Sequence, residues 1–238
     1  MNGPTARERV IVALDVPDMP GLLAFLDRLE GQPVFYKVGL ELFLAEGARA
    51  IDAVKARGGR LFLDLKLHDI PETVGRAVTS AVRFGAELLT VHTAGGLEMM
   101  KRAVEAAGQT TVLGVTVLTS LSDGDLVADG ISGSVADAVV RRAKVAAAAG
   151  VPGLVCSPQE VVQVKAASGL VTVVPGVRPA GAALGDQKRV ATPASTIAAG
   201  ADYLVIGRPI RDAASPAEAF ATVVREVEQA LASPSSTR

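Results

Sequence analysis

Short runs rich in β-branched residues alternate with longer Ala-, Leu- and Glu-rich stretches along the whole of this 238-residue chain. The runs are typical of β-strands and the longer stretches of α-helices, and no linker interrupts the alternation. The predicted strands are 10–15, 34–39, 60–67, 87–92, 111–118, 153–157, 170–174 and 202–207. The predicted helices are 20–30, 41–57, 72–85, 96–107, 134–149, 158–167, 192–200 and 216–232.

This repetition of strand and helix predicts an α/β protein with the fold of a single-domain (β/α)8 TIM barrel. The alternative is an open, doubly wound sheet. A Gly-rich turn after the first strand would favour that sheet, but the chain reads LDVPDMPG there. We therefore assign residues 1–238 to one barrel domain and expect flexible tails at 1–8 and 233–238.

The composition excludes several classes of partner. Hydrophobic residues make up 49% of the chain, enough for a large core, while the net charge of −1 and the 3% of aromatic residues argue against a nucleic-acid-binding protein. A single cysteine, Cys156, cannot form an internal disulfide and fits a reducing compartment. We find no signal-peptide pattern and no apolar run of membrane-spanning length, so we expect a cytoplasmic protein without a membrane partner.

The stretch LFLDLKLHDIP (61–71) places three charges in an otherwise apolar strand. Strand alternation directs its leucines toward the helices and directs Asp64 and Lys66 toward the barrel interior, near the carboxyl ends of the strands where such barrels carry their sites. Asp69 has the opposite parity and belongs to the turn that enters the next helix. The alternative readings are a structural ion pair for Asp64 and Lys66 and a helix cap for Asp69.

Two further charges end neighbouring predicted strands. Asp15 ends the first strand and Lys37 lies in the second, in VFYKVG. Either one alone fits a solvated charge at the rim. Together with Asp64 and Lys66 they predict a row of alternating charges in which every member stays ionised, with an ammonium group fixed where negative charge can develop on a substrate.

The last two predicted strands end in motifs that suit a phosphate group. VVPGVRP supplies Gly176 and Arg178, and VIGRPI supplies Gly207 and Arg208. Glycine lets backbone N–H groups approach an anion and arginine offers a bidentate fork, in the two loops that commonly bind phosphate in these barrels. A turn glycine beside a surface arginine is the plainer alternative. The long loop from Arg178 to Ala191 has the composition of a closing lid.

The remaining candidates for metal or acid–base chemistry are few. His68 and His92 fit supporting or core hydrogen-bonding roles, and two histidines with one cysteine form no zinc constellation. A magnesium site made by Asp64 and Asp69 would have the ammonium of Lys66 between its ligands. We therefore expect no metal and no cofactor.

Taken in order, VALDV, YKVG, DLKLHDIPETV, TVLTS, VVPGVRP followed by GDQ, and YLVIGRPI resemble the orotidine 5′-phosphate decarboxylase family from about residue 10 to residue 210. The resemblance implies a homodimeric (β/α)8 barrel that converts orotidine 5′-monophosphate to UMP and CO2. This is the last step of de novo pyrimidine biosynthesis, and the resemblance implies that it needs no metal or cofactor.

The resemblance also implies a role for each matching position. Lys66 is expected to protonate C6 of the pyrimidine, with Asp64 beside the departing carboxylate and Lys37 hydrogen-bonded nearby. Asp69 is expected to reach the partner subunit's site and is counted with those three as catalytic. The implied substrate-binding residues are Asp15, Lys37, Asp64, Asp69, Ile70, Thr73, Thr119, Arg178, Gln187, Gly207 and Arg208.

Two other functions remain open from the sequence. Sister enzymes, a Mg²⁺-dependent 3-keto-gulonate 6-phosphate decarboxylase or a hexulose phosphate synthase, share the D-x-K-x-x-D core but are not expected to combine GDQ with Lys37. A non-catalytic nucleotide-binding barrel would have no reason to keep a buried proton donor such as Lys66.

Overall fold

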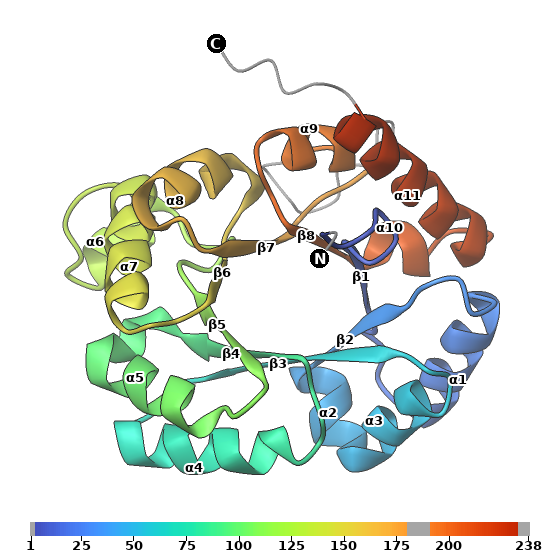
Figure 1. The fold of residues 1–238 in the computed structure, drawn as a ribbon, viewed down its shortest axis with the longest axis horizontal. Helices are drawn as coiled ribbons and strands as arrows, with labels where there is room; N and C mark the ends of the chain where they lie inside the picture. The colour runs from blue at the N-terminus through green and yellow to red at the C-terminus, as the bar shows by residue number, and fades with distance from the viewer. Residues whose placement is uncertain (1–2, 180–190, 233–238) are drawn as a thin grey trace.

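Eight parallel strands close into a barrel, as the sequence predicted (Figure 1). The computed structural model describes residues 3–179 and 191–232. Each strand pairs with the next in chain order, and the last pairs with the first through Val10–Leu204 and its neighbours. The strands are β1 (Val10–Ala13), β2 (Phe35–Gly39), β3 (Arg60–Leu67), β4 (Leu88–His92), β5 (Thr111–Val115), β6 (Gly153–Val155), β7 (Val171–Pro175) and β8 (Tyr203–Ile206).

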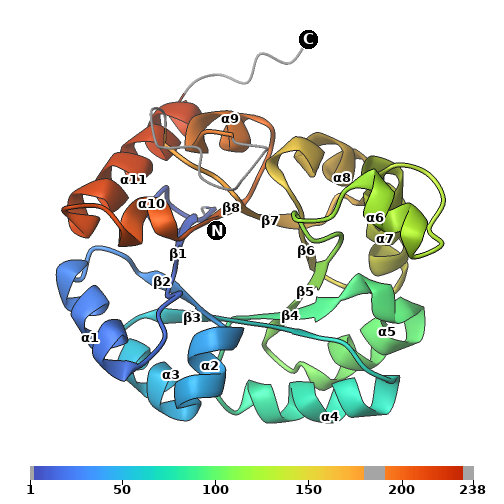
Figure 2. The same ribbon diagram turned by 180° about the vertical axis from the view of Figure 1, so that it is seen from behind.

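The helices form a ring around the barrel, and the view from behind shows the same ring (Figures 1 and 2). None of the helices in the described part of the chain is long and apolar enough to cross a membrane. The α-helices are α1 (Met19–Arg28), α2 (Leu40–Glu46), α3 (Ala48–Lys55), α4 (Pro71–Val82), α5 (Gly96–Ala106), α6 (Asp123–Ala128), α7 (Val135–Ala148), α8 (Val161–Ser168), α9 (Pro193–Ala198), α10 (Arg208–Arg211) and α11 (Pro216–Ala232). The 3₁₀ turns are η1 (Thr93–Gly95) and η2 (Pro158–Glu160).

Local sequence signals explain where several helices begin. Ser134 caps α7, because its hydroxyl accepts a hydrogen bond from the Asp137 backbone while the Asp137 carboxylate accepts one from the Ser134 backbone. Ser122 and Asp125 form the same box at α6, a helix that was not predicted from the sequence. The short helix α10 was not predicted either.

The single helix predicted over 41–57 is wrong. The chain breaks there into α2 and α3 at Gly47, whose backbone has φ +55°, in the left-handed region that glycine adopts without strain. The strand predicted over 111–118 is also too long, since β5 ends at Val115 and the chain then turns along the barrel mouth.

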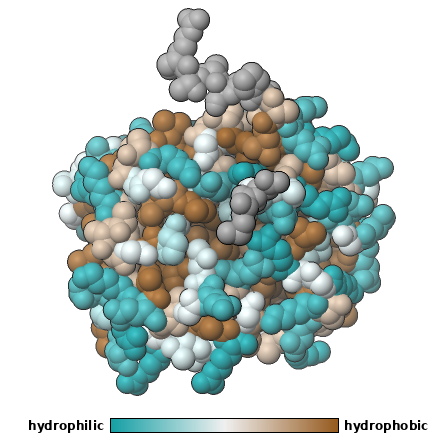
Figure 3. Space-filling view, viewed as in Figure 1, coloured by the Kyte–Doolittle hydropathy of each residue, from teal (hydrophilic) through white to brown (hydrophobic). Residues whose placement is uncertain are grey.

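Side chains pack in two layers, as the alternation of the strands predicts. One layer fills the barrel, and the other lies between the strands and the helices; Leu61 and Leu63 belong to the outer layer while Phe62 lies inside. The buried residues inside the barrel are Ile11, Ala13, Phe35, Phe62, Leu88, Leu113, Val173 and Val205. Hydrophilic side chains dominate the rim of the molecule in the space-filling view (Figure 3).

One irregularity interrupts the ladder between β3 and β4. Leu63 pairs with Leu89, but the next pair joins Leu67 to Val91, so three residues of β3 face a single residue of β4. This is a β-bulge, a feature that often re-aims side chains beside active sites. It falls on the charged part of β3, where Lys66 has φ +50°.

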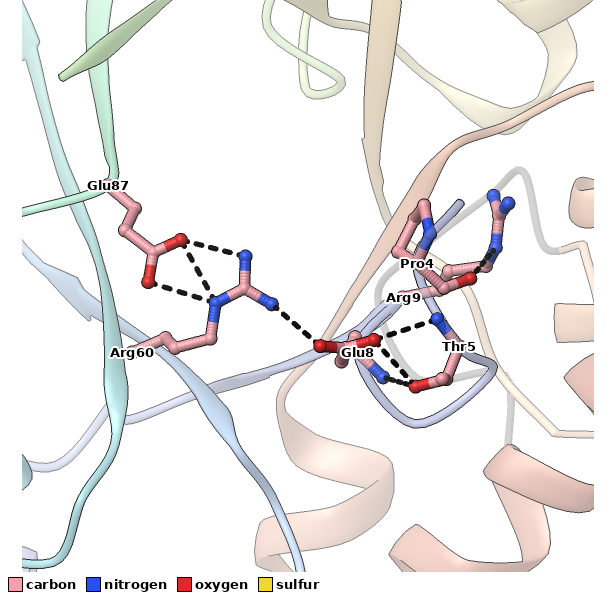
Figure 4. A network of polar contacts seen from close by, with 6 residues as sticks. All are labelled: Pro4, Thr5, Glu8, Arg9, Arg60 and Glu87. Carbon is pink, nitrogen blue, oxygen red and sulfur yellow. Dashed lines mark hydrogen bonds and ion pairs between the residues drawn. The ribbon is translucent and has the colours of Figure 1, made fainter. Parts of the chain in front are cut away.

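The amino end of the barrel is closed by polar contacts (Figure 4). Arg60, the first residue of β3, donates to both carboxylate oxygens of Glu87 and lies 3.8 Å from a carboxylate oxygen of Glu8. Glu8 in turn accepts hydrogen bonds from the backbone and hydroxyl of Thr5. These contacts hold the segment before β1 against the strands. The other predicted tail, 233–238, lies outside the described residues.

Candidate active site

A cavity of about 310 Å³ opens at the carboxyl ends of the strands. This volume suits a small ligand, and the position is where parallel barrels carry their sites. The predicted site residues that line it are Asp15, Lys37, Asp64, Lys66, Thr119, Arg178, Gly207 and Arg208. Residues that are separated by up to 193 positions in the sequence therefore share one cavity.

The predicted row of alternating charges is present on one wall of this cavity. The Lys37 ammonium lies 3.0 Å from Oδ1 of Asp15 and 3.5 Å from Oδ2 of Asp64. The Lys66 ammonium donates to both oxygens of Asp64 at 2.8 Å. The row thus runs Asp15–Lys37–Asp64–Lys66 across β1, β2 and β3.

Asp64 lies at the centre of this row, and its side chain is only 11% exposed. Burial would raise the pKa of its carboxyl group, but the charges of Lys37 and Lys66 and the hydrogen bonds from Lys66 and Thr90 outweigh that effect and lower the pKa below its usual value. Asp64 therefore stays negative at neutral pH and holds both ammonium groups in place.

Backbone features on β1 and β2 give the row its room and its support. Gly39 comes two residues after Lys37, and a Cβ there would lie 3.0 Å from the Lys37 ammonium and 3.5 Å from Oδ1 of Asp15. On the β1 side, Arg211 of α10 donates to the backbone carbonyl of Asp15 at 2.6 Å. Glycine at position 39 and the arginine together let the first two members of the row approach each other.

The β-bulge gives Lys66 its position. The Lys66 backbone N–H donates to the Thr90 hydroxyl at 2.8 Å, and that hydroxyl donates to Oδ1 of Asp64 at 2.9 Å. The sequence analysis did not single out Thr90. The signal was available, because alternation in ELLTVH puts this polar residue on the inner face of β4 together with Leu88.

The residues predicted to bind an anion, which follow β7 and β8, line the same cavity. Gly176 has φ +78°, and Arg178, although charged, is only 7% exposed; its backbone N–H donates to the carbonyl of Ala191. Gly207 approaches β1 so closely that a Cβ would lie 3.3 Å from Oδ2 of Asp15. Arg208 follows as the first residue of α10. Two arginines and two glycines therefore line the cavity together with the charge row.

Three described residues of the predicted set do not line this cavity. Asp69, Ile70 and Thr73 are exposed beside it, at the turn into α4, and the Asp69 carboxylate accepts from the Ile70 backbone N–H. This position fits the parity argument, which kept Asp69 out of the inner row. Gln187 lies outside the described residues.

The histidines and the cysteine occupy supporting positions. The rings of His68 and His92 stack with centroids 5.3 Å apart, and burial together with nearby positive charge lowers the pKa of His92 to about 4. Cys156 is buried at the edge of the cavity, and burial raises the pKa of its thiol, so the sulfur stays protonated. Over residues 3–179 and 191–232, no three His, Cys, Asp or Glu side chains come together as a metal-binding group.

The fold and the site are those of a (β/α)8-barrel enzyme, in which charged groups from several parallel strands converge at the carboxyl ends of the strands. Residues 8–223 match the model of the orotidine 5′-phosphate decarboxylase / HUMPS family. The chain belongs to this family.

Similar proteins agree with this assignment. The orotidine 5′-phosphate decarboxylase of Anaeromyxobacter sp. (strain K) is 55% identical over 89% of this chain and 95% of its own length. The orotidine 5′-phosphate decarboxylase of Thermobifida fusca is 50% identical over 95% of this chain and 98% of its own length. The crystal structure of the orotidine 5′-phosphate decarboxylase from Lactobacillus acidophilus covers 92% of this chain and 99% of its own, with a TM-score of 0.82 and 35% identity.

Proposed function

We propose that this protein decarboxylates orotidine 5′-monophosphate to UMP and CO2, the last step of de novo pyrimidine biosynthesis. The observation that carries the proposal is the row Asp15–Lys37–Asp64–Lys66 in a cavity that Arg178 and Arg208 also line. The names of the relatives, at about half identity over nearly the whole chain, support the same activity.

The chemistry of this substrate suits a fixed cation. Breaking the bond between C6 and the carboxylate releases CO2 and leaves an electron pair on C6, in an orbital that the ring π-system does not delocalise. The ring offers no suitable carbonyl for a Schiff base. An ammonium group beside C6 stabilises that charge and then donates its proton to form the C6–H bond of UMP.

Lys66 is the group that we assign to this step. Its ammonium donates at 2.8 Å to Asp64, and the lowered pKa of Asp64 keeps this carboxylate negative beside the lysine. After proton transfer the neutral amine regains a proton from solvent. The proposed cycle therefore needs neither a metal nor a cofactor.

The rest of the substrate is assigned along the cavity. Asp15 and Lys37 are proposed to hold the ribose hydroxyls, and Thr119 to contact the base. Arg178, Gly207 and Arg208 are proposed to bind the phosphate, with Gln187 bridging phosphate and base. Binding energy from a phosphate far from C6 then lowers the barrier when it is used to orient the reacting end rather than only to tighten binding.

We also propose a homodimer in which Asp69, Ile70 and Thr73 complete the partner's site, since all three are exposed beside the mouth rather than inside it. Mixing inactive Lys66→Ala with inactive Asp69→Ala protein is expected to restore part of the activity, because one hybrid site has both groups. No recovery after verified subunit exchange would contradict a shared site.

We place the reaction in the cytoplasm, which the use of a single buried cysteine supports.

The test of the activity follows the loss of orotidylate absorbance in excess EDTA. Turnover under these conditions is expected. No turnover with EDTA, restored by Mg²⁺, would instead favour a metal-dependent sister activity. Binding of orotidylate without turnover in either condition would favour a non-catalytic nucleotide-binding barrel.

A further inference from the structure

The bulge in β3 puts Lys66 into a backbone conformation that lysine seldom adopts. In the described residues only two non-glycine residues have positive φ, Lys66 at +50° and Glu30 at +52°. Such a conformation is strained for a residue with a side chain and persists only where neighbouring groups stabilise it. Glu30 lies in a turn after α1, whereas Lys66 lies at the reacting end of a barrel strand.

The stabilising group is on β4. Thr90 is the single residue that faces the bulge, between the pairs Leu63–Leu89 and Leu67–Val91. Its hydroxyl accepts from the Lys66 backbone N–H at 2.8 Å and donates to Oδ1 of Asp64 at 2.9 Å. The Lys66 ammonium, at 2.8 Å from both Asp64 oxygens, closes the ring of contacts.

In this ring the Thr90 hydroxyl both accepts and donates a hydrogen bond, and it does so away from water. Thr90 is fully buried, so no bulk water replaces its hydrogen bonds if the hydroxyl is removed. Because each bond in the ring polarises the next, one missing member affects both the Lys66 backbone and the Asp64 carboxylate. The Thr90 hydroxyl thus fixes both the backbone of Lys66 and the Asp64 carboxylate that binds the Lys66 ammonium.

We propose that Thr90 is a positioning residue for Lys66, which fixes the left-handed backbone and the Asp64 carboxylate so that the ammonium stays aimed into the cavity. Thr90 does not line that cavity, so it acts through the two charged residues. The inference rests on the proposed decarboxylase function, in which Lys66 is the proton donor.

Another buried threonine, Thr172, serves as a control for a hydroxyl with a purely structural role. Thr172 of β7 is also fully buried, and its hydroxyl also contacts a carboxylate, Oδ2 of Asp202 at 3.2 Å. That contact is at the amino end of the barrel, away from the cavity. Thr172→Val is therefore the matched control, with the same substitution, the same burial and the same kind of partner.

The experiment compares kcat and KM for orotidylate in wild type, Thr90→Val, Thr90→Ser and Thr172→Val. Thr90→Val keeps the shape and removes both hydrogen bonds, so kcat is expected to fall by about 10- to 100-fold, the size of loss caused by small misplacement of a reacting group. KM is expected to stay within about twofold, because the groups assigned to phosphate and ribose are untouched. Thr90→Ser keeps the hydroxyl and is expected to stay within about threefold of the wild-type kcat, with Thr172→Val at the wild-type value.

Three results would overturn the inference: an unchanged kcat in Thr90→Val, equal losses in Thr90→Val and Thr90→Ser, or the same loss in Thr172→Val. If Thr90→Val does not fold, Thr90→Cys takes its place, since a thiol of similar size is only a weak donor. A kcat equal to that of Thr90→Ser would then overturn it. An inactive wild type would refute the proposed function itself, which a silent Thr90→Val in an active enzyme would leave standing.

Discussion

Strand β3 carries a basic residue near each of its ends, and the two are surrounded differently. Arg60, at the amino end, donates to Glu87 at 2.8 to 3.0 Å (Figure 4). Its guanidinium also lies 4.3 Å from the ring centre of Phe35. Lys66, near the carboxyl end, pairs with Asp64 and faces a cavity.

The two ends differ in the burial of the acids. The carboxylates that face Arg60 are 39% and 46% exposed, so water solvates them whether or not the pair forms. Asp64 is 11% exposed and depends on its partners to stay charged. Exposed ion pairs such as those of Arg60 add little free energy, whereas the ion pairs made by the buried Asp64 are costly to maintain. The ion pairs of β3 that are costly to bury are therefore the ones beside the cavity.

The largest effect that would separate the two ends is the loss of the Lys66 ammonium. Lys66→Ala removes the group assigned to stabilise and protonate C6, so kcat is expected to fall at least about a thousandfold. The circular dichroism spectrum and binding of UMP are expected to persist. A variant that keeps a near-native rate would show that the carboxyl end has no special role for this cation.

A smaller effect is expected from crowding the row without removing any charge. Gly39→Ala puts a Cβ 3.0 Å from the Lys37 ammonium, which must move by a few tenths of an ångström. We expect a loss of about tenfold in kcat/KM. Gly124→Ala in α6 is the control, because the nearest atom to its Cβ is 3.7 Å away, and it should keep the wild-type value. Equal values for both variants would mean that the spacing of the row is not critical.

The smallest effect on turnover is expected at the amino end. Arg60→Met keeps the apolar stem but loses the ion pairs and the cation–π contact, so the free energy of unfolding in urea is expected to fall by about 1–2 kcal/mol. The kcat should change less than twofold. Arg76→Met, at a side chain 78% exposed and paired with Glu72, should cost below about 0.5 kcal/mol. A large fall in kcat for Arg60→Met would break the distinction between the ends.

The barrel was predictable because its signal is local and repeated. Each strand shows the alternation that puts one face inside and the other under the helices, as Phe62 and Leu61 illustrate. The break at Gly47 was not predictable from the same pattern, since a single glycine within an amphipathic stretch is compatible with a continuous helix. Helix α6 was missed because DGDLVADG has the composition of a loop, although Ser122 and Asp125 supplied its capping box.

The site was predictable as far as parity and strand ends determine it. Asp15, Lys37, Asp64 and Lys66 were found because charges on inner faces at the same edge of a sheet must converge. Thr90 was missed because its role depends on the bulge, in which β3 has two extra residues opposite β4. The register between two strands cannot be predicted from the sequence of either strand alone.

Closure of the barrel through β8 and β1 has a consequence for synthesis of the chain on the ribosome. All four residues of the charge row have been made once residue 66 has emerged. Arg178 and Arg208, which line the same cavity, are translated later. The last strand, β8, must then insert between β7 and β1. In a nascent or truncated chain the lysines of the row therefore lack the arginines that complete the cavity. The complete cavity can therefore form only after β8 has been made and has paired with β1.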